Sequence, residues 1–409
     1  MAITINQQPS GLVSAFNHID FLVDTNNTQP IFSYQIKPIV SGIAIAQYVK
    51  PKSIYGDKAH FDAQRTIQNQ VSYDITGIVN NTTGIYKAAN VFKEFYIQFA
   101  ELSGTTNTNV ASGSPSNSNT LIAVNTAFEY EDTFKTDYIR DYVIDAFANK
   151  YFLTGLRGGS IRIGSNDFFE LGMMQDKLST SFSKLEIKTY GFGGSLIGTY
   201  VITNSFANTS TTSEQFLSCQ VGTASLNSQT LASGTQPIIT DAVDKYTIQA
   251  LNAANTAQSE LLTFQIDRDC YKYTPVRIFW LNKVGRFDAY NFNFANDKSY
   301  QVTKDFYLKQ GGAVVSNSFV RSSYETGDTA FNTRIESTIK LRTDYISTIE
   351  SQWIAEMVKT PLAFIFQNGR LFPIKISTSS YTNKDTRKDG MFIEEIDVQF
   401  TNASYRQRF

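Results

Sequence analysis

Few residues in this chain have the chemistry of a nucleophilic or metal centre. The 409 residues include two histidines, His18 and His60, and two cysteines, Cys219 and Cys270. A Ser-His-Asp or Cys-His site needs a histidine beside its nucleophile, and each histidine is better interpreted as a surface or satisfied side chain. The histidines and cysteines also lack the spacing of metal ligands. We therefore predict no catalytic, cofactor-binding or metal site, and two buried free thiols rather than a disulfide.

Paired carboxylates are the other chemistry to consider, because a glycosidase needs only two of them. Acidic residues gather in Glu129–Asp132, Asp267–Asp269 and Glu394–Glu395. The second group is interpreted as a solvated turn rather than a cation site, and the third as a bulge or the start of a strand. Aromatic side chains could form a platform for sugars, but packing in cores and interfaces is the favoured interpretation. The chain is accordingly not expected to be an enzyme.

The composition favours strands and argues against a highly charged partner. Basic and acidic residues number 36 and 37, and charged residues make up 18% of the chain, below the usual share of about a quarter. No long run of one sign occurs, so neither nucleic acid nor a membrane surface is an expected partner. Aromatic residues reach 13%, and they favour strands. No signal peptide and no membrane-spanning helix are expected.

The elements that organise the chain begin with Thr274–Phe294, its most apolar and aromatic stretch. Alternating residues predict two strands joined by a tight turn at Asn282–Gly285. A hairpin with so many bulky side chains is expected at the centre of a sheet, where both faces have neighbours. Its polar residues are interpreted as turn-forming and its aromatic residues as core packing. The residues singled out in this structural hairpin are Arg277, Trp280, Asn282, Lys283, Gly285, Phe287 and Asp288.

One helix is predicted near the end of the sequence. Ser347–Glu350 matches a capping box and precedes an apolar stripe at helical spacing. Pro361 ends the helix, and a hairpin with Asn368-Gly369 at its turn follows. Together with a strand over 393–401, these elements predict a compact α+β unit. The stripe comprises Ile346, Ile349, Trp353, Ile354 and Met357, of which Ile349, Trp353 and Met357 mark a predicted assembly helix.

The predicted fold is mainly β, with tandem antiparallel β-sandwich domains and a small C-terminal α+β unit. Length alone favours two or three domains, and turn signals about every ten residues at the start of the chain are typical of a sandwich or barrel. We predict an N-terminal sandwich over 1–135, a second sandwich over 136–295 and an assembly domain over 296–409. The low-complexity segment 103–120 is predicted to be a long polar loop of the first domain.

The hairpin sequence resembles a segment of known virion proteins. Arg277–Asn293, RIFWLNKVGRFDAYNFN, is similar to a segment in virion proteins of tailed phages of marine bacteria and Bacteroidota, including crAss-like phages. Residues 4–23 and the C-terminal stretches 361–381 and 397–409 are also similar to parts of those proteins, in the same order. In this chain Arg286 stands where the family segment has a second glycine.

The resemblance implies a non-enzymatic tail component, built of β-sandwich domains and assembled in several copies around the tail axis. Its implied partners are copies of itself, in a ring or another symmetric assembly, and other tail proteins. Its implied location is the virion, after synthesis in the host cytoplasm. The layer would be a ring, a baseplate or a fibre attachment. Few charges, many aromatic residues and polar loops suit a chain that buries surface against partners.

Two other functions stay open. A glycan-binding adhesin or receptor-binding protein of the tail tip would use aromatic side chains on a sandwich face. A carbohydrate-active enzyme would use paired carboxylates, and it receives the least support. A ring requires a head-to-tail interface that closes by rotation, and strand edges in the C-terminal domain could extend a neighbour's sheet.

Overall fold

The computed structural model describes residues 3–26, 32–51, 56, 58–80, 82–103, 110–135, 138–147, 149–176, 182–208, 211–269, 272–309, 311–321, 323, 327–378 and 391–406. The chain divides into two compact units. The first comprises Met1–Arg268 and Leu281–Asp288, and the second comprises Asp269–Trp280 and Ala289–Phe409. Cys219 is a buried free cysteine, and Cys270 lies outside the described residues, so the prediction about their pairing stays a prediction.

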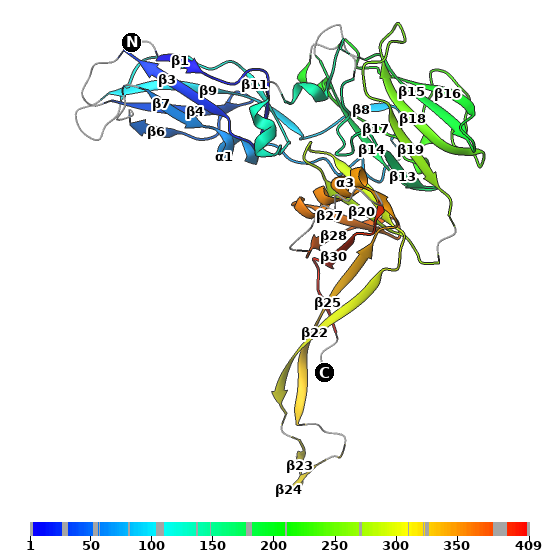
Figure 1. Cartoon of the computed structure of the whole chain (residues 1–409). Coiled ribbons are helices and arrows are strands. Elements are labelled where there is room, and N and C mark those ends of the chain that lie inside the picture. The colour runs from blue at the N-terminus through cyan, green and yellow to red at the C-terminus, as the bar shows by residue number, and fades with distance from the viewer. Residues whose placement is uncertain are drawn as a thin grey trace. The chain divides into compact units, whose positions relative to one another are not determined.

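The first part of the first unit contains two sheets that face each other across one core (Figure 1). A three-stranded sheet has the order β1 (Ile3–Gln7), β3 (Asp20–Thr25) and β7 (Ala59–Asp62). A seven-stranded sheet has the order β2 (Leu12–Ser14), β11 (Leu121–Val124), β9 (Phe92–Ser103), β4 (Phe32–Val40) and β5 (Ile43–Ala44), with β10 (Val110–Asn117) on β9 and β6 (Tyr48–Pro51) on β4. The rings of Phe21 and Phe99 pack together between the sheets, with their centroids 5.9 Å apart.

The prediction of a polar loop over 103–120 is wrong for much of its length. β10 pairs antiparallel with β9, from Val110 opposite Ser103 to Asn117 opposite Gln98. Residues 104–109 lie outside the described part of the chain. Backbone hydrogen bonds to a long neighbouring strand let a segment with little apolar surface adopt a strand, because the ladder does not depend on side-chain burial.

The rest of the first unit contains two further sheets. The four-stranded one has the order β12 (Val143–Ile144), β14 (Glu170–Gln175), β17 (Phe216–Gln220) and β8 (Ile85–Lys87). The five-stranded one has the order β13 (Ser160–Gly164), β19 (Leu262–Asp267), β18 (Val243–Leu251), β15 (Lys184–Gly191) and β16 (Leu196–Thr203). Short helical turns are α1 (Gln64–Ile67), η1 (Gln68–Gln70), η2 (Tyr130–Phe134), η3 (Arg140–Tyr142), η4 (Thr212–Glu214) and α2 (Thr223–Leu226). Because β8 pairs with β17, the predicted boundary at residue 135 does not separate two sets of strands.

The second unit is built on one long sheet and one helix. The sheet has the order β21 (Phe287–Phe292), β20 (Val276–Leu281), β27 (Ala363–Gln367), β28 (Arg370–Ile376), β30 (Glu395–Phe400), β25 (Asp328–Arg342) and β22 (Asp297–Leu308), with β31 (Ser404–Tyr405) on β25. Two small sheets pair β23 (Ala313–Val315) with β24 (Ser318–Val320) and β26 (Ile346–Ser347) with β29 (Met391–Phe392). The helix is α3 (Thr348–Lys359).

The predicted hairpin forms, but two expectations about its place are wrong. β21 stands at one end of the strand order, not at its centre. The boundary at 295 grouped the hairpin with the second sandwich, whereas β20 pairs with β27 of the C-terminal sheet. Trp280 and Tyr290 are nevertheless buried, because α3 supplies the neighbours that a second flanking strand was expected to supply. Trp353 of α3 lies 5.1 Å from Trp280 and 6.2 Å from Tyr290, measured between ring centroids.

Helix α3 begins as its sequence predicts. The Ser347 side chain accepts a hydrogen bond from the Glu350 backbone N–H, and the Glu350 carboxylate accepts one from the Ser347 N–H at 2.8 Å. Trp353 and Met357 are buried inside their own unit, so the predicted assembly helix uses them for its own core. Ile349 departs from the predicted stripe, since its side chain is 42% exposed.

Replacing Trp353 with alanine should lower the free energy of unfolding by about 3–5 kcal/mol, because it removes a buried aromatic side chain and leaves a cavity. The matched control on the same helix is Ile349→Ala, which should change stability by less than about 0.5 kcal/mol at an exposed position. Urea denaturation followed by tryptophan fluorescence and circular dichroism measures both. Equal losses for the two variants would contradict the packing described for α3.

Candidate functional site

The turn of the hairpin is organised by the side chain of Asn282. Its amide oxygen accepts hydrogen bonds from the backbone N–H groups of Val284 (3.1 Å) and Arg286 (3.0 Å). Its amide nitrogen donates to the carbonyl of Leu153 at 3.2 Å. Asn282 therefore has the turn-forming role expected from the sequence, and it also joins the turn to a distant segment of the first unit.

Gly285 and Lys283 bring the same turn against residues 125–127. Gly285 has a φ of +79°, and a Cβ on it would overlap the carbonyl oxygen of Asn125, so only glycine fits there. The carbonyl of Lys283 accepts a hydrogen bond from the Ala127 N–H at 2.8 Å. The Lys283 ammonium lies 3.8 Å from the Asp132 carboxylate. Both residues thus position backbone rather than a ligand.

Arg286 is the residue that the sequence analysis noticed only as a departure from a glycine. It is 3% exposed, and its guanidinium lies 3.8 Å from the carboxylate of Glu170, which is 6% exposed. The guanidinium also donates to the Leu217 carbonyl at 3.5 Å. Gly172 leaves room for it, because a Cβ at that position would collide with the Arg286 side chain.

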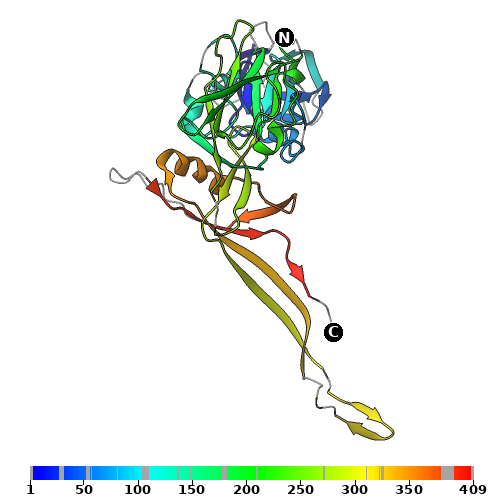
Figure 2. The ribbon, with the colours of Figure 1, turned by 90° about the vertical axis from the view of Figure 1, so that its right-hand side faces the viewer.

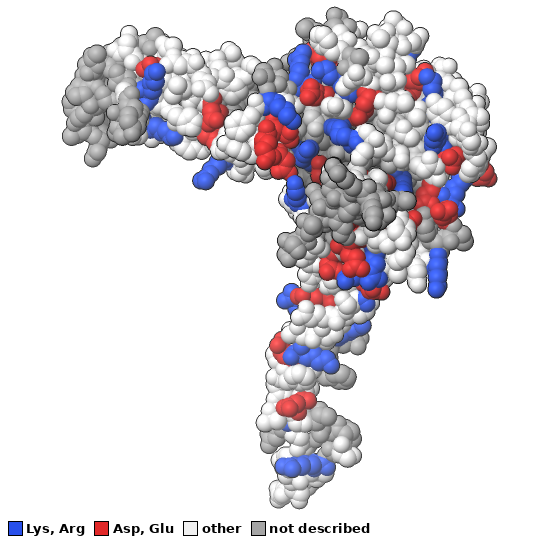
Figure 3. Space-filling view, in the orientation of Figure 1, with Lys and Arg blue, Asp and Glu red and all other residues white. Residues whose placement is uncertain are grey.

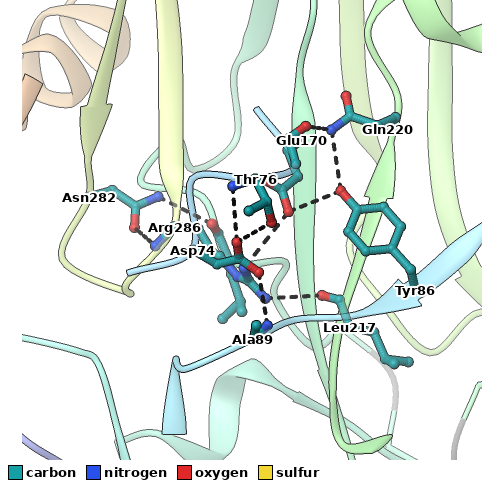
Figure 4. Close-up of polar contacts among 11 residues, drawn as sticks. Asp74, Thr76, Tyr86, Ala89, Glu170, Leu217, Gln220, Asn282 and Arg286 are labelled. Carbon is teal, nitrogen blue, oxygen red and sulfur yellow. Dashed lines mark hydrogen bonds and ion pairs between the residues drawn. The ribbon is translucent and has the colours of Figure 1, made fainter. Parts of the chain in front are cut away.

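A polar network surrounds this ion pair inside the first unit (Figure 4). The Tyr86 hydroxyl donates to Glu170 at 3.2 Å and accepts from the Gln220 amide at 3.3 Å. The Asp74 carboxylate accepts from the Thr76 hydroxyl at 2.5 Å and from the Ala89 N–H at 2.8 Å. Strands β8, β14 and β17 and the hairpin turn each contribute to this network.

Burial shifts the pKa values of the ionisable groups in and beside the network. Burial raises the pKa of Glu170, against the opposing effect of the Arg286 charge. Burial likewise raises the pKa of Tyr86, helped by the Glu170 charge, and raises the pKa of the Cys219 thiol to about 12. Burial also pushes the pKa of Asp74 upward, but its hydrogen bonds from Thr76 and Ala89 outweigh that effect and the pKa is lowered.

This network has the residue types of an acid–base site without the access of one. A carboxylate with a raised pKa can serve as a general acid, but Glu170 and Arg286 are both buried, and a catalytic group must reach its substrate. The arrangement instead holds the hairpin turn to three strands. Glu170, Tyr86 and Gln220 are linked by hydrogen bonds. Arg286 and Asp74 bond to nearby backbone, although Arg286 Nη1 and Gln220 Oε1 make no hydrogen bond within the described part of the chain. A linked buried network of this kind favours one specific packing.

The remaining predicted hairpin residues have structural contacts in the unit to which each belongs. Arg277 donates to Asn291 at 2.9 Å and stacks on the Phe279 ring at 5.0 Å. Asp288 accepts a hydrogen bond from the Gly155 N–H at 2.8 Å. Phe287 contacts Tyr73 edge-on at 6.0 Å. These contacts are consistent with packing and give no ligand-binding arrangement.

The structure brings both histidines together with two aspartates, which the sequence analysis did not foresee. His18 Nδ1 lies 2.6 Å from Asp62, and His60 Nε2 lies 2.7 Å from Asp20. The hydrogen bond that His18 makes to Asp62, followed by the Asp62 charge, raises the pKa of His18. A signal was available: His-x-Asp occurs at 18–20 and again at 60–62, and Asp20 and Asp62 are opposite each other on β3 and β7.

These side chains include the donors of a possible metal site. Ligand atoms of His18, Asp20 and Asp62 lie within 4.8 Å of one another, and imidazole with carboxylate suits several divalent transition metals. Each histidine is already hydrogen-bonded to a carboxylate, so the direct role of the cluster is to link β3 to β7. It lies at the exposed surface of the first unit.

A cleft of about 660 Å³ lies beside this cluster in the first unit. Apolar side chains such as Leu12, Val13 and Ile122 share its lining with Lys135 and Arg140. Among the described residues that line it, Tyr138 alone offers a phenol or phenyl ring. Carbohydrate binding through stacked aromatic rings therefore has little support at this cleft.

The most exposed element of the second unit is a long two-stranded ribbon (Figure 2). We call β22, together with the part of β25 that pairs with it (Asp328–Lys340), the arm. All 12 residues of β22 are exposed. They include Tyr300 at 60%, Phe306 at 58% and Leu308 at 80%. On the face drawn in Figure 3, basic and acidic residues lie beside one another along the arm, with uncharged surface between these groups.

Comparisons with known proteins give no argument about the fold or the function of this chain. No protein-family model matches the sequence, and no curated protein matches it. A solved structure described as Drosophila OTK, extracellular domains 3-5, is similar at 11% sequence identity and a TM-score of 0.21, over 82% of this chain and 92% of that one. A likeness this distant carries no argument about function.

The chain is a mainly β protein with several antiparallel sheets and few helices. Within the described residues, none of the helices has the length and apolar character needed to cross a membrane.

The ion pair at the hairpin turn can be tested by a double-mutant cycle. Arg286→Met should lower the free energy of unfolding by about 3–5 kcal/mol, because it leaves the Glu170 carboxyl buried without its partner. Glu170→Met with Arg286→Met should lower it less than Arg286→Met alone, since no buried charge then remains. Urea denaturation of the four proteins measures the coupling. An Arg286→Met protein as stable as the parent would show that the pair does not hold the turn.

Stability should also depend on pH through Glu170. Its pKa is raised from the ordinary value of 4.5, so the folded chain holds this proton more tightly than the unfolded chain. This stabilising contribution is complete below about pH 4.5 and is lost as pH rises through the folded pKa. Glu170→Gln should therefore flatten the decline in unfolding free energy above pH 4.5, measured by denaturant titration. The same slope in both proteins would contradict the raised pKa.

Proposed function

We propose that this chain is a non-enzymatic structural subunit that acts by multimeric assembly. The resemblance to tail proteins of tailed phages gives the setting: a ring, baseplate or fibre-attachment layer of the virion. The arm is the observation that supports assembly. The proposed partners are further copies of the chain and other tail proteins.

The contacts within the arm itself give it little stability in water. An isolated two-stranded ribbon is at best marginally stable. On its β25 side the arm is flanked by β31 at Arg334 and Ile335, but the β22 edge offers backbone groups to another chain. Contiguous exposed apolar side chains mark interaction surfaces, and Tyr300, Phe306 and Leu308 are mostly exposed. An element of this length and exposure is best explained by a partner that covers it.

The base of the arm is firmly anchored in the second unit. β25 pairs with β22 on one edge and with β30 on the other, from Thr338 opposite Gln399 to Arg342 opposite Glu395. Arg342 and Lys340 lie 2.7 Å and 3.2 Å from the Glu395 carboxylate. The arm therefore extends a rigid sheet, which suits an element that must be presented to a neighbour.

Glycan binding remains the second proposal, and the arm favours it less. Sugar recognition combines an aromatic platform with polar groups that bond hydroxyls, whereas Tyr300 is followed on its face of β22 by Val302. An adhesin at the tail tip would bind host polysaccharide as a single copy. Binding assays with host polysaccharide on the monomeric chain distinguish it from the assembly proposal.

Shortening the arm should abolish association without unfolding the chain. In the test variant, an Asn-Gly turn replaces residues 304–333 and joins Thr303 to Arg334, which are cross-strand partners and suit a two-residue hairpin. The expected result is an unchanged circular dichroism spectrum and a monomer, where the parent forms higher species. Light scattering coupled to size exclusion and sedimentation velocity measure this.

The matched control is Thr303→Ser, which alters the arm conservatively and should associate like the parent. If the parent chain stays monomeric over the concentration range tested and binds no tail protein, the assembly proposal is wrong. Tight binding of polysaccharide by that monomer would then favour the adhesin.

A further inference from the structure

We infer that the arm binds the arm of a second copy of this chain, face to face and with the two arms antiparallel. This inference rests on the proposed function, and it adds the partner, the face and the orientation. It is drawn from the distribution of side chains over the two faces of the ribbon.

One face of the arm continues the core of its own unit. Ile339 and Leu341 of β25 are buried under the sheet, and residues at every second position of a strand share a face. That face passes outward along β25 through Ser337 and Ile335. We call it the apolar face. Its residues on β22, from base to end, are Lys298, Tyr300, Val302, Lys304, Phe306 and Leu308, and their partners on β25 are Ile339, Ser337, Ile335, Thr333, Ala330 and Asp328.

The opposite face makes polar contacts within the chain over most of its length. The Asn332 amide donates to Asp305 at 2.9 Å. Glu336 lies 2.6 Å from Arg334 and accepts from the Gln399 amide at 2.7 Å. Only near the far end does this face turn aromatic, where Tyr307 and Phe331 contact each other at 6.2 Å. On the apolar face, Lys298 lies over the rings of Tyr300 and Phe400 at the base. Further out, Phe306 and Leu308 remain mostly exposed.

The charges at the two ends of the apolar face favour an antiparallel copy as the occupant. Lys298 marks the base, and Asp328 marks the far end. Two arms related by a two-fold axis near Val302 and Lys304 would bring Lys298 of each against Asp328 of the other. The parallel alternative would place like charges opposite each other, which is destabilising. The third charged residue of this face, Lys304, would lie near its own copy in the antiparallel and in the parallel arrangement, so it does not decide between them.

The same two-fold axis also brings apolar residues of the two arms opposite each other. It places Tyr300 of one arm opposite Phe306 of the other, and aromatic pairs of this kind add to the energy of area burial. Lys298 would lie close to Leu308, which its alkyl chain can cover. A two-fold contact repeats each pair twice, because the same patch serves both subunits.

The area of the arm limits the strength of this contact. A strand of 12 residues spans roughly 40 Å, and a two-stranded ribbon about 10 Å wide presents roughly 400 Å². A pair of arms would bury roughly 800 Å² in total, below the ~1,200 Å² of small stable interfaces. The isolated pairing is therefore weak and concentration-dependent, and it gains strength where other subunits hold the two copies together.

Cross-linking tests the orientation directly. In a Cys270→Ser background, one sample carries Lys298→Cys and another carries Leu308→Cys. The native Cys219 is buried with its pKa raised to about 12, so it reacts slowly. Facing sheets lie about 10 Å apart, too far for a disulfide, so a short bis-maleimide is the reagent. The mixture should form a mixed dimer at least about tenfold more readily than either sample alone.

Two variants serve as controls. Val302→Cys, near the proposed axis, should cross-link to itself, and Thr303→Cys on the opposite face should not. Cross-linking of Lys298→Cys to itself in preference to the mixture would establish parallel arms and overturn the inference. Cross-linking through Thr303→Cys in preference to Val302→Cys would establish the wrong face and overturn it as well.

A charge exchange separates this inference from the proposed function. Lys298→Asp and Asp328→Lys should each weaken association about tenfold, and the two together should restore it. These exposed positions leave the fold intact. If the parent chain associates but neither change alters its affinity, only the arm pairing is wrong. If the parent chain does not associate at all, the proposed function fails with it.

Discussion

The buried pairing of Arg286 with Glu170 is the constraint on which the first unit depends. Two charges are stable inside a protein only when their partners are in place, so the strands that carry them cannot shift independently. The hairpin turn adds a second demand, because Gly285 lies against the Asn125 carbonyl with no room for a side chain. Five segments therefore meet one turn that belongs, in sequence, to the last third of the chain. They lie near residues 74, 125–127, 153, 170–172 and 217.

The sequence predicted correctly the elements that depend on neighbouring residues. It failed to predict features that depend on contacts with distant segments. The capping box at Ser347 and the Asn282 turn formed as expected, because each depends on residues within four positions. Ile349 lies at a helical stripe position but is exposed, since spacing specifies a face and not what covers it. The hairpin lies at the end of its sheet because a helix, rather than a strand, covers its aromatic residues. Strand β10 exists because β9 offers a long ladder.

The site residues also divide into features visible in the sequence and contacts that only the fold creates. Arg286 drew attention only because it replaces a glycine of a resembling family, and its carboxylate partner lies 116 positions earlier, from Arg286 back to Glu170. The two His-x-Asp triplets were visible in the sequence, but their meeting required the pairing of β3 with β7. For the arm, alternation over 334–342 indicates a half-buried strand. That alternation does not tell whether the apolar side of the strand is covered by the same chain or by another one.

Strand β25 runs without interruption from the exposed arm into the core, where its neighbours on both sides are hydrogen-bonded to it. A force applied along the arm would therefore reach the sheet as shear on that strand. Backbone hydrogen bonds in an antiparallel ladder run perpendicular to the strand, so the bonds from Thr338 to Arg342 would bear such a load together instead of opening one after another. The arm and its base thus form a single mechanical element, able to transmit tension without unzipping.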